Sequence, residues 1–271
     1  MLKEKVSLGV VQETLLITLW ARAVEASQQQ PILYDSKAVD ILSQIDYNFN
    51  KVSKSLSSQL IVCIRGQTID QLVKNFLQNY PRTTVIEIGA GLNTRFERLD
   101  NGTLNWFDLD LADSMAVRQR FFEESDRRKF ISGSVLESHW INKMKTSISN
   151  PLLFIAEGVL VYFTESQVKQ LFAMLADNFP GSFLIFDAIS PFMVKYHRNW
   201  DAIKYTSANL QWGIKNIQEI ETWDSRYKVE NSLYFSDCSQ YFPRFPLIER
   251  LLITFIPYLT RTSGMHLVRL G

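Results

Sequence analysis

A glycine-containing segment is the part of this chain best suited to bind a small ligand. Glu87-Ile88-Gly89-Ala90-Gly91 closes the β-branched run 83–88, which is typical of a buried strand. Glycines at such a turn let the backbone bend tightly and let a ligand approach closer than any Cβ permits. The sequence therefore predicts a binding loop here, with a plain strand-to-helix turn as the alternative.

Two acids, Asp108 and Asp110, follow at the end of the next predicted strand, 103–109. A carboxylate at this place can accept two hydrogen bonds from ribose hydroxyls. A dinucleotide-binding loop requires a third small residue, where this chain has Thr94, and the Gly-Lys-Ser/Thr ending of a phosphate loop is absent. An acid at this distance after the glycines is also found in dinucleotide-binding proteins. An NAD(P)-linked Rossmann oxidoreductase therefore stays open as an alternative.

The surrounding segments alternate between strand and helix. Thr164 and Gln167 form a capping box that predicts a helix through Asn178, and a helix is also expected over 113–125. Such alternation implies an open, mostly parallel sheet with helices on both faces and a ligand beyond the carboxyl ends of the strands. The further strands are expected at 128–132, 151–157, 182–188, 251–258 and 265–270, the last two as an antiparallel closing pair.

The first eighty residues are expected to form helices, because apolar residues recur at helical spacing over 11–23 and 56–64. Pro31 follows three glutamines and ends the first helix, and Pro81 separates the last helix from the first strand. Residues 1–80 are therefore predicted to be a helical cap on the α/β part of the chain.

The composition excludes several classes of protein. The 29 Lys+Arg and 28 Asp+Glu residues nearly balance, which argues against a surface for nucleic acid or an anionic membrane. Two cysteines and three scattered histidines do not form a metal site, so no metal is expected. No apolar stretch reaches the roughly 18 residues of a membrane span, and we expect a cytoplasmic protein.

Four motifs together resemble the leucine carboxyl methyltransferase family, which includes bacterial polyketide carboxyl O-methyltransferases. These are class I enzymes that bind S-adenosylmethionine (SAM). The resemblance runs from about residue 11 to residue 188 and is specific because the motifs occur jointly. The motifs are Leu19-Trp20-Ala21-Arg22-Ala23 with Asp46-Tyr47-Asn48-Phe49, Ile64-Arg65-Gly66-Gln67-Thr68-Ile69-Asp70, Gly89-Ala90-Gly91-Leu92-Asn93-Thr94-Arg95, and Ala156-Glu157-Gly158-Val159-Leu160-Val161-Tyr162-Phe163.

The resemblance implies a Rossmann-like class I methyltransferase sheet, mostly parallel with an antiparallel closing strand, plus the N-terminal helical cap. It also implies SAM-binding roles for particular residues. Arg65 would pair with the SAM carboxylate, and Glu157 would face the cofactor and favour its sulfonium. A surface arginine and a loop carboxylate are the respective alternatives. Gly89 and Gly91 would line the methionine portion, and Asp110 would bind the ribose, with Asp108 as second choice.

The chain departs from the family pattern at three places. Asn93 replaces an aspartate and removes a charge near the loop, and Arg65-Gly66-Gln67 stands for Arg-Thr-Arg. Ser134-Val135 stands where the family has an Asp-Leu pair beside adenine, and a serine accepts a weaker bond than a carboxylate. A non-catalytic, methyltransferase-like binding domain therefore remains a further alternative.

The function that the resemblance implies is SAM-dependent O-methylation, with a carboxylate of a small metabolite as the expected acceptor. A carboxylate is ionised at neutral pH and needs no general base, which suits a chain without an assignable catalytic residue. A hydroxyl of a small molecule is the alternative acceptor, and a protein carboxylate is less expected than either. Residues 81–271 would form the SAM-binding domain, with an acceptor-pocket insertion around 192–236, in one compact unit.

Overall fold

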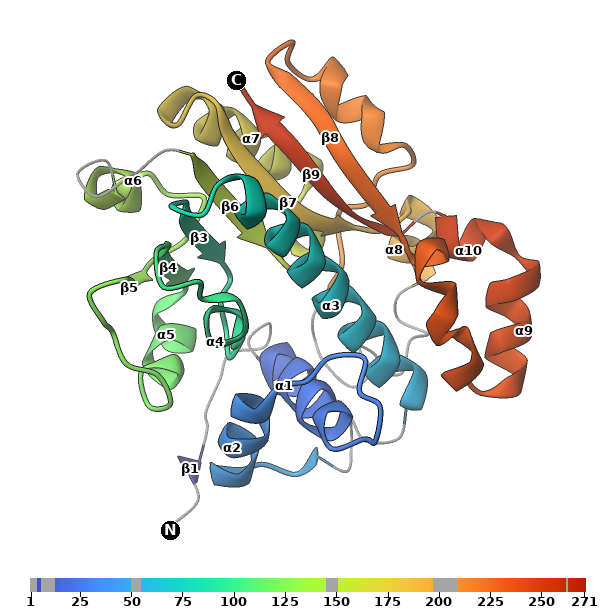
Figure 1. Ribbon diagram of the computed structural model, residues 1–271. Helices are drawn as coiled ribbons and strands as arrows, with labels where there is room; N and C mark the ends of the chain where they lie inside the picture. Colours follow the sequence, from blue (N-terminus) through green and yellow to red (C-terminus); the bar gives the residue numbers. More distant parts are fainter. Residues whose placement is uncertain (1–3, 6–12, 50–54, 145–150, 197–208, 262) are drawn as a thin grey trace.

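The structure is a computed structural model that describes residues 4–5, 13–49, 55–144, 151–196, 209–261 and 263–271 (Figure 1). Its centre is a seven-stranded sheet in which β9 alone runs opposite to the other six strands. The predicted mostly parallel sheet with an antiparallel closing strand is therefore confirmed. In spatial order the strands are β5 (Arg128–Ser132), β4 (Asn105–Asp110), β3 (Thr84–Ile88), β6 (Leu152–Ala156), β7 (Ser182–Ala188), β9 (Gly264–Leu270) and β8 (Tyr227–Tyr234).

The chain order reverses between β3 and β6. From β3 the chain proceeds to β4 and β5 on one side, and it then returns to form β6 and β7 on the other. Such a switch leaves a crevice beyond the carboxyl ends of the two central strands, because their following loops diverge. The predicted binding loop follows β3 and therefore lies at this crevice.

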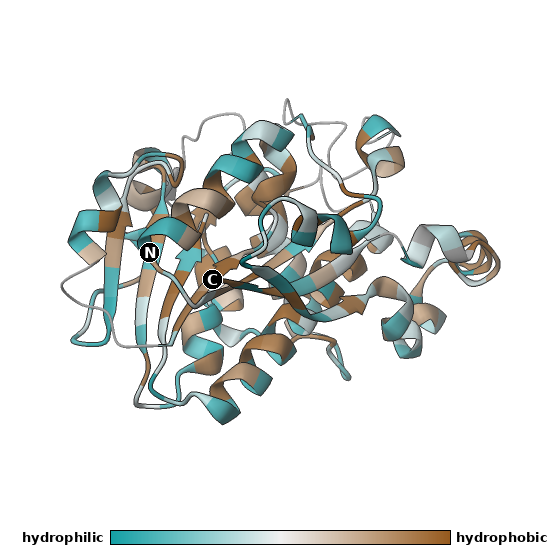
Figure 2. Ribbon diagram, turned by 90° about the horizontal axis from the view of Figure 1, so that it is seen from above, coloured by the Kyte–Doolittle hydropathy of each residue, from teal (hydrophilic) through white to brown (hydrophobic). Residues whose placement is uncertain are grey.

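Helices cover both faces of the sheet, and the strands between them are apolar (Figure 2). The helix α3 (Leu56–Asn79) packs Ile69, Val73 and Phe76 on the face that includes Val85 of β3. The next residue of β3, Ile86, points to the opposite face, where α6 (His139–Met144) and α7 (Glu165–Asn178) pack. Both faces are thus buried, as expected for parallel strands.

The N-terminal part is helical, as predicted from its spacing. The helices α1 (Glu13–Ala26) and α2 (Ser36–Gln44) pack with the first turns of α3, and the short strands β1 (Glu4–Lys5) and β2 (Ile45–Asp46) pair beside them. Since α3 contributes both to this cap and to the sheet's cover, the division at residue 80 stays a prediction.

Two predicted elements differ in the structure. The helix α5 (Ala112–Arg118) ends well before residue 125, because Phe121 and Phe122 turn inward to pack against α1 and α2. The predicted strand 251–258 is wrong: this segment lies in the helices α9 (Leu247–Phe255) and α10 (Pro257–Arg261). The antiparallel partners of β9 are instead β7 on one side and β8 on the other. The strand β8 lies in the predicted insertion around 192–236, of which residues 197–208 lie outside the described residues.

Candidate active site

A cavity of about 240 Å³ opens at the carboxyl ends of β3, β4, β5 and β6. Five of the predicted site residues line it, namely Gly89, Gly91, Asp110, Ser134 and Val135. Its remaining walls are largely apolar and come from Thr14, Leu15, Ile88, Leu109, Leu111, Ser114, Gly133, Gly158, Val159, Tyr162 and Phe163. The sequence thus identified the loops that form this cavity, from residues far apart in the chain.

The two loop glycines are required by the backbone. Gly89 has φ 64° and Gly91 has φ 47°, a left-handed conformation that residues with a Cβ rarely adopt. A Cβ on Gly89 would also lie 2.4 Å from Cγ2 of Val159. Side chains at these positions would therefore deform the loop and fill space that borders the cavity.

Asp110, at the end of β4, is positioned to accept hydrogen bonds. Its Oδ2 accepts the Gly91 N–H at 2.6 Å, and its Oδ1 accepts the N–H of Leu111 at 2.7 Å. Burial raises the pKa of this carboxyl, while the two backbone donors oppose the rise. Each carboxylate oxygen keeps a further lone pair, so the side chain can also accept bonds from two hydroxyls in the cavity.

The cavity wall that follows β5 carries Ser134-Val135 instead of the acid of the family pattern, so it is less polar. Ser134 accepts the Leu136 N–H at 3.3 Å and leaves its hydroxyl proton available, whereas Val135 is buried and apolar. This wall can therefore offer a neutral hydroxyl and an apolar contact to a ligand, without a charge.

Asp108 does not reach the cavity. It lies inside β4, fully buried, where it pairs with Arg118 at 3.0 Å and with Arg128 at 2.8 Å. Its other oxygen accepts the indole N–H of Trp106 at 3.0 Å. Two cations and an indole therefore occupy the carboxylate, which leaves it unsuited to the predicted second-choice role at a ribose.

Arg118 supports the glycine loop from beneath and was missed by the sequence analysis. Its Nη1 donates to the carbonyl oxygens of Ala90, Gly91 and Asn93 at 3.2, 2.7 and 2.9 Å. The guanidinium is fully buried and lies 4.3 Å from the centre of the Phe122 ring. Nothing in the local sequence marks this arginine as a support of the loop, because the three carbonyl groups that it binds lie more than twenty residues away.

Arg65 and Glu157 lie beside the cavity rather than in its wall. The Arg65 Nε is 3.0 Å from Glu157 Oε1, and its Nη1 is 3.4 Å from Oδ2 of Asp187. The guanidinium packs against Gly158, where a Cβ would lie 3.2 Å from Nη2, and Gly158 itself lines the cavity. Arg65 is thus separated from the cavity by one glycine.

Glu157 remains ionised although it is buried. Burial raises its pKa, but Arg95 and Arg65 outweigh this and hold the pKa of Glu157 well below its usual range. Asn93 adds a weaker bond at 3.4 Å. A fixed negative charge therefore lies directly before Gly158.

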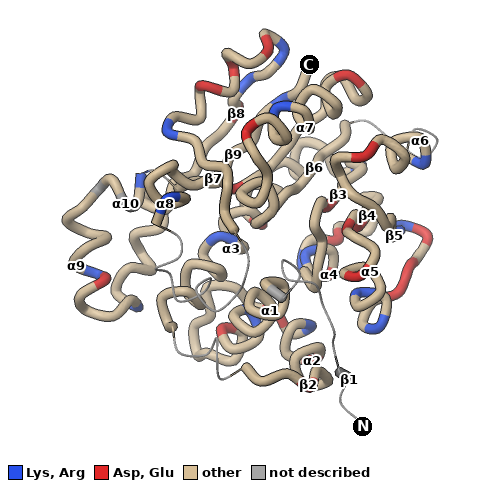
Figure 3. The backbone as a smooth tube through the Cα atoms, turned by 180° about the vertical axis from the view of Figure 1, so that it is seen from behind, with Lys and Arg blue, Asp and Glu red and all other residues tan. Residues whose placement is uncertain are grey.

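The helix α4 (Arg95–Leu99), which follows the glycine loop, lies beside the cap helices (Figure 3), and a network of ion pairs joins it to them. Asp70 of α3 binds both Arg95 and Arg98 at 2.7 Å. Asp35, just before α2, binds Arg98 at 3.2 Å and accepts the Thr94 hydroxyl at 2.6 Å. The start of α4 is thereby held from two sides.

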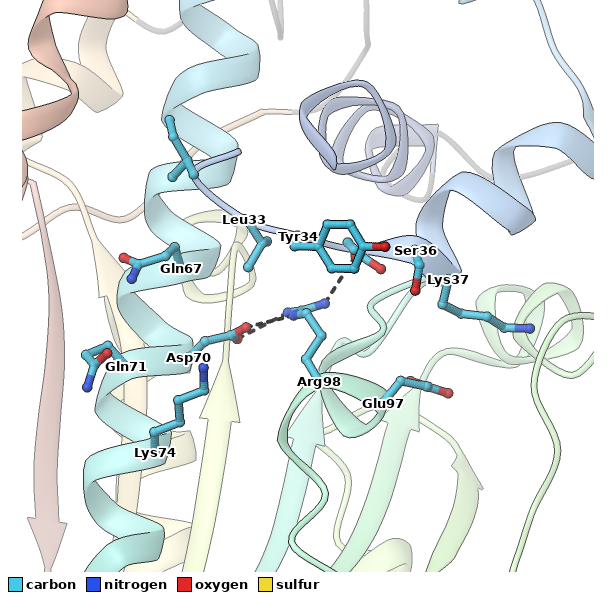
Figure 4. Close-up of a pocket in the computed structure, with 12 residues that line it drawn as sticks. Leu33, Tyr34, Ser36, Lys37, Gln67, Asp70, Gln71, Lys74, Glu97 and Arg98 are labelled. Carbon is cyan, nitrogen blue, oxygen red and sulfur yellow. Dashed lines mark hydrogen bonds and ion pairs between the residues drawn. The ribbon is translucent and has the colours of Figure 1, made fainter. Parts of the chain in front are cut away.

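A second, larger cavity of about 430 Å³ lies over this network, between the segment before α2, α3 and α4 (Figure 4). Its central side chains, Asp70 and Arg98, point toward one another rather than toward the opening. Because these charges already pair with each other, we assign no ligand to this cavity. Among the described residues, no three His, Cys, Asp or Glu side chains gather as a metal ion would require.

Known proteins resemble this chain in sequence and in fold. The profile of the family described as Leucine carboxyl methyltransferase matches residues 15–176. The tetracenomycin polyketide synthesis O-methyltransferase TcmP of Streptomyces glaucescens is 30% identical over 220 residues, 81% of either chain. The SAM-dependent methyltransferase dpfgK of Gibberella zeae is 28% identical over 242 residues, 81% of this chain and 80% of its own.

Among solved structures, a SAM-dependent methyltransferase from Anabaena variabilis superposes with a TM-score of 0.52. The match covers 100% of this chain and 99% of the other, at 10% identity. At that identity the likeness concerns the fold alone.

Proposed function

We propose that this chain, which belongs to the leucine carboxyl methyltransferase family, transfers the methyl group of SAM to a carboxylate oxygen of a small metabolite. The predicted family is confirmed, and with it the class of a SAM-dependent methyltransferase rather than an NAD(P)-linked oxidoreductase. The residues that bind the cofactor and the nature of the acceptor are the proposal.

The cavity at the ends of β3 to β6 is the proposed cofactor site. Asp110 would accept the ribose hydroxyls, and Gly89 and Gly91 would pass against the methionine portion. Ser134 and Val135 would border the adenine. One observation carries this assignment. The carboxylate oxygens of Asp110 can accept further hydrogen bonds beside a loop whose conformation requires glycines.

Arg65 is proposed to act at the carboxylate end of the methionine portion, and Glu157 at its cationic sulfonium. The ionised Glu157 lies one residue before the cavity wall and would favour a positive sulfonium. Arg65 has a side chain 23% exposed, so it retains a path toward a ligand carboxylate past Gly158. SAM supplies an already activated methyl group, and the protein need only align it with the acceptor and exclude water.

The chemistry of the lining residues favours a carboxylate acceptor. The residues that form the cavity include no His, Lys or Cys, and the proposal assigns Asp110, the one acid among them, to the ribose. A hydroxyl acceptor would need a base, whereas a carboxylate is ionised at neutral pH. Burial raises the pKa of Tyr162, which therefore remains a neutral donor able to hold a carboxylate oxygen.

None of the described helices is long and apolar enough to cross a membrane. Cys63 and Cys238 are free thiols, which fits a reducing compartment, and a cytoplasmic location stays a prediction.

Thermal unfolding with SAM, its demethylated product, NAD or NADP tests the cofactor site. A ligand at 100 times its Kd stabilises by about 2.7 kcal/mol, which is worth several degrees in Tm. We expect a shift with the two adenosyl ligands alone, lost in Asp110→Ala and kept in the matched variant of an exposed acid, Asp126→Ala. An unchanged shift in Asp110→Ala would refute the assigned ribose contact.

The acceptor is tested with labelled SAM and a panel of small carboxylic acids and phenols. A methyl ester releases methanol in alkali, whereas a methyl ether does not. Label that is lost as methanol supports the carboxylate acceptor, and label that stays bound after alkali contradicts it.

A further inference from the structure

The helix α9 is apolar and has no buried residue, although it belongs to a folded chain. It projects from the side of the molecule beyond the end of the sheet (Figures 1 and 2). The exposed side chains continue onto α10 and from there onto the helix α8 (Pro191–Tyr196), where Phe192 contacts Tyr258 of α10 with ring centroids 6.1 Å apart. We call these residues the α9 surface: Leu247, Ile248, Leu251, Leu252, Phe255, Ile256, Tyr258, Phe192 and Tyr196.

The α9 surface is too large to be an ordinary scatter of exposed apolar residues. Its members are between 41% and 75% exposed, and Ile248 and Phe255 reach 74% and 75%. Since aromatic side chains present about 150–250 Å² and aliphatic ones somewhat less, the nine together expose on the order of 800 Å². The largest apolar patch of a typical monomer is about 300–600 Å².

The geometry of the helix separates its attachment from this face. Ile253 packs inward against the core formed by α1 and α3. At 3.6 residues per turn, the six apolar residues from Leu247 to Ile256 span about 180° of the opposite side. Glu249 borders that span on one flank; on the other flank Thr254 borders it, and Arg250 follows about 60° beyond the edge. The face is therefore apolar in its middle, with side chains of opposite charge on its two sides.

We propose that the α9 surface is the interface of a symmetric dimer of this chain, with the two-fold axis along α9. A standard interface buries about 800 Å² on each partner, which matches the area that this surface exposes. A two-fold axis parallel to the helix brings the Glu249 flank of one copy opposite the Arg250 flank of the other. An axis across the helix would instead place Glu249 against Glu249, which is unfavourable.

The charges favour a protein partner over a membrane. Helices that lie on membranes carry many Lys and Arg residues on the flanks of the apolar face. The helix α9 carries one glutamate and one arginine, and α8 and α10 add only Lys195 and Arg261, far fewer basic residues than such membrane helices carry (Figure 3). A second copy supplies an apolar face to cover this one and, opposite each charged flank, a side chain of the other sign.

Light scattering after gel filtration tests the proposal on the full chain. We expect a mass twice 31.4 kDa, falling to that of one chain in Ile248→Glu and in Phe255→Glu. The matched control is Val39→Glu, which places the same charge on α2 at an apolar residue that is 40% exposed. Unfolding curves and SAM binding of each variant verify that it remains folded.

A cysteine at the centre of the face tests the direction of the axis. Ile248 and Phe255 lie seven residues apart near the middle of the apolar span, and the two native thiols are buried. With an axis along α9, both Ile248→Cys and Phe255→Cys form a disulfide with the same residue of the partner. With an axis across α9, at most one of them does, and Val39→Cys forms none in either case.

Three outcomes would overturn the proposal. The first is a wild-type chain that remains monomeric over a wide range of concentration, and the second is a dimer that persists in both glutamate variants. The third is a monomer that sediments with vesicles of phosphatidylserine and phosphatidylcholine and loses this binding in Phe255→Glu, since the surface would then meet lipid.

Discussion

Asp108 and Asp110 lie on one strand but differ in what surrounds them. Asp108 is a buried partner of Arg118 and Arg128, whereas Asp110 is half-buried and bonded to backbone N–H groups. Breaking a buried pair on one side leaves the other charge uncompensated, which costs about 3–5 kcal/mol. We therefore expect Asp108→Asn to lower the free energy of unfolding by about 3–5 kcal/mol. Asp110→Asn should change it by less than about 1 kcal/mol, and urea unfolding curves measure both.

The same pair of variants separates the two assigned roles. Asp110→Asn should weaken SAM binding at nearly normal stability. If Asp108→Asn instead kept wild-type stability and selectively lost SAM affinity, then Asp108 would be the ribose acid and Asp110 would not.

Glu87, at the end of β3, should make stability depend on pH. Burial raises its pKa to about 7 from an ordinary value of 4.5, against the opposing charge of Arg95, and its Oε2 has no hydrogen-bond partner among the described residues. A carboxyl whose pKa is raised on folding contributes stability that is complete below pH 4.5 and is lost as the pH rises through about 7.

The matched variant Glu87→Gln cannot ionise and isolates this contribution. Between pH 4.5 and pH 7 the wild type should lose about 1–3 kcal/mol relative to the variant, as measured by urea unfolding at each pH. The pKa values of three other acids are lowered, namely those of Asp35, Asp70 and Glu157. These acids change the free energy of unfolding below about pH 4, with the opposite sign, and they are present in both the wild type and Glu87→Gln. Parallel profiles across the window would contradict the raised pKa.

At the scale of elements, the helix α7 begins with a cap that the sequence predicted. The Thr164 hydroxyl accepts the N–H of Gln167 at 3.3 Å, and the Gln167 side chain accepts the N–H of Thr164 at 2.9 Å. Thr164→Ala should lower the free energy of unfolding by about 1 kcal/mol, whereas Thr164→Asn should retain most of it. Equal losses in the two variants would mean that the cap bond contributes nothing.

The strands of the parallel sheet could be predicted because each is a short apolar run bounded by turn residues. The run 182–188, between Pro180-Gly181 and Pro191, coincides with β7. The segment 251–258 has the same apolar character, and periodicity alone cannot distinguish a buried strand from a helix in so short a run. Pro246 and Pro257 frame α9, and proline is well tolerated at or before a helix start.

The site could be predicted only where a local motif carries it. Gly89, Gly91 and Asp110 follow strands, so their place at the cavity follows from topology. The pairing of Arg118 with Asp108, and that of Arg65 with Asp187, joins residues on different elements. Such pairs depend on the three-dimensional arrangement, which a single sequence does not specify.

At the scale of the whole molecule, buried charges connect the cap to the sheet. Arg22 of α1 binds Asp35 at 2.9 Å and donates to the Leu92 carbonyl oxygen of the glycine loop at 2.7 Å. On the same helix, Glu25 binds Arg244, a residue near the start of α9. The distance from Arg244 Nη2 to Glu25 Oε2 is 3.0 Å. We therefore expect the cap and the SAM-binding part to unfold together, as one compact unit.

Arg22→Met tests this expectation, because it removes the charge and keeps much of the apolar stem. It leaves Asp35 buried with one partner fewer, so the free energy of unfolding should fall by about 3 kcal/mol while the transition stays single. Coincident thermal curves from far-UV and near-UV circular dichroism measure this. Lys37→Met, at the exposed pair with Asp40, should cost less than about 0.5 kcal/mol. A variant in which the cap melts in an earlier, separate transition would show that the cap is an independent unit, and the link through Arg22 would then not be what makes the molecule cooperative.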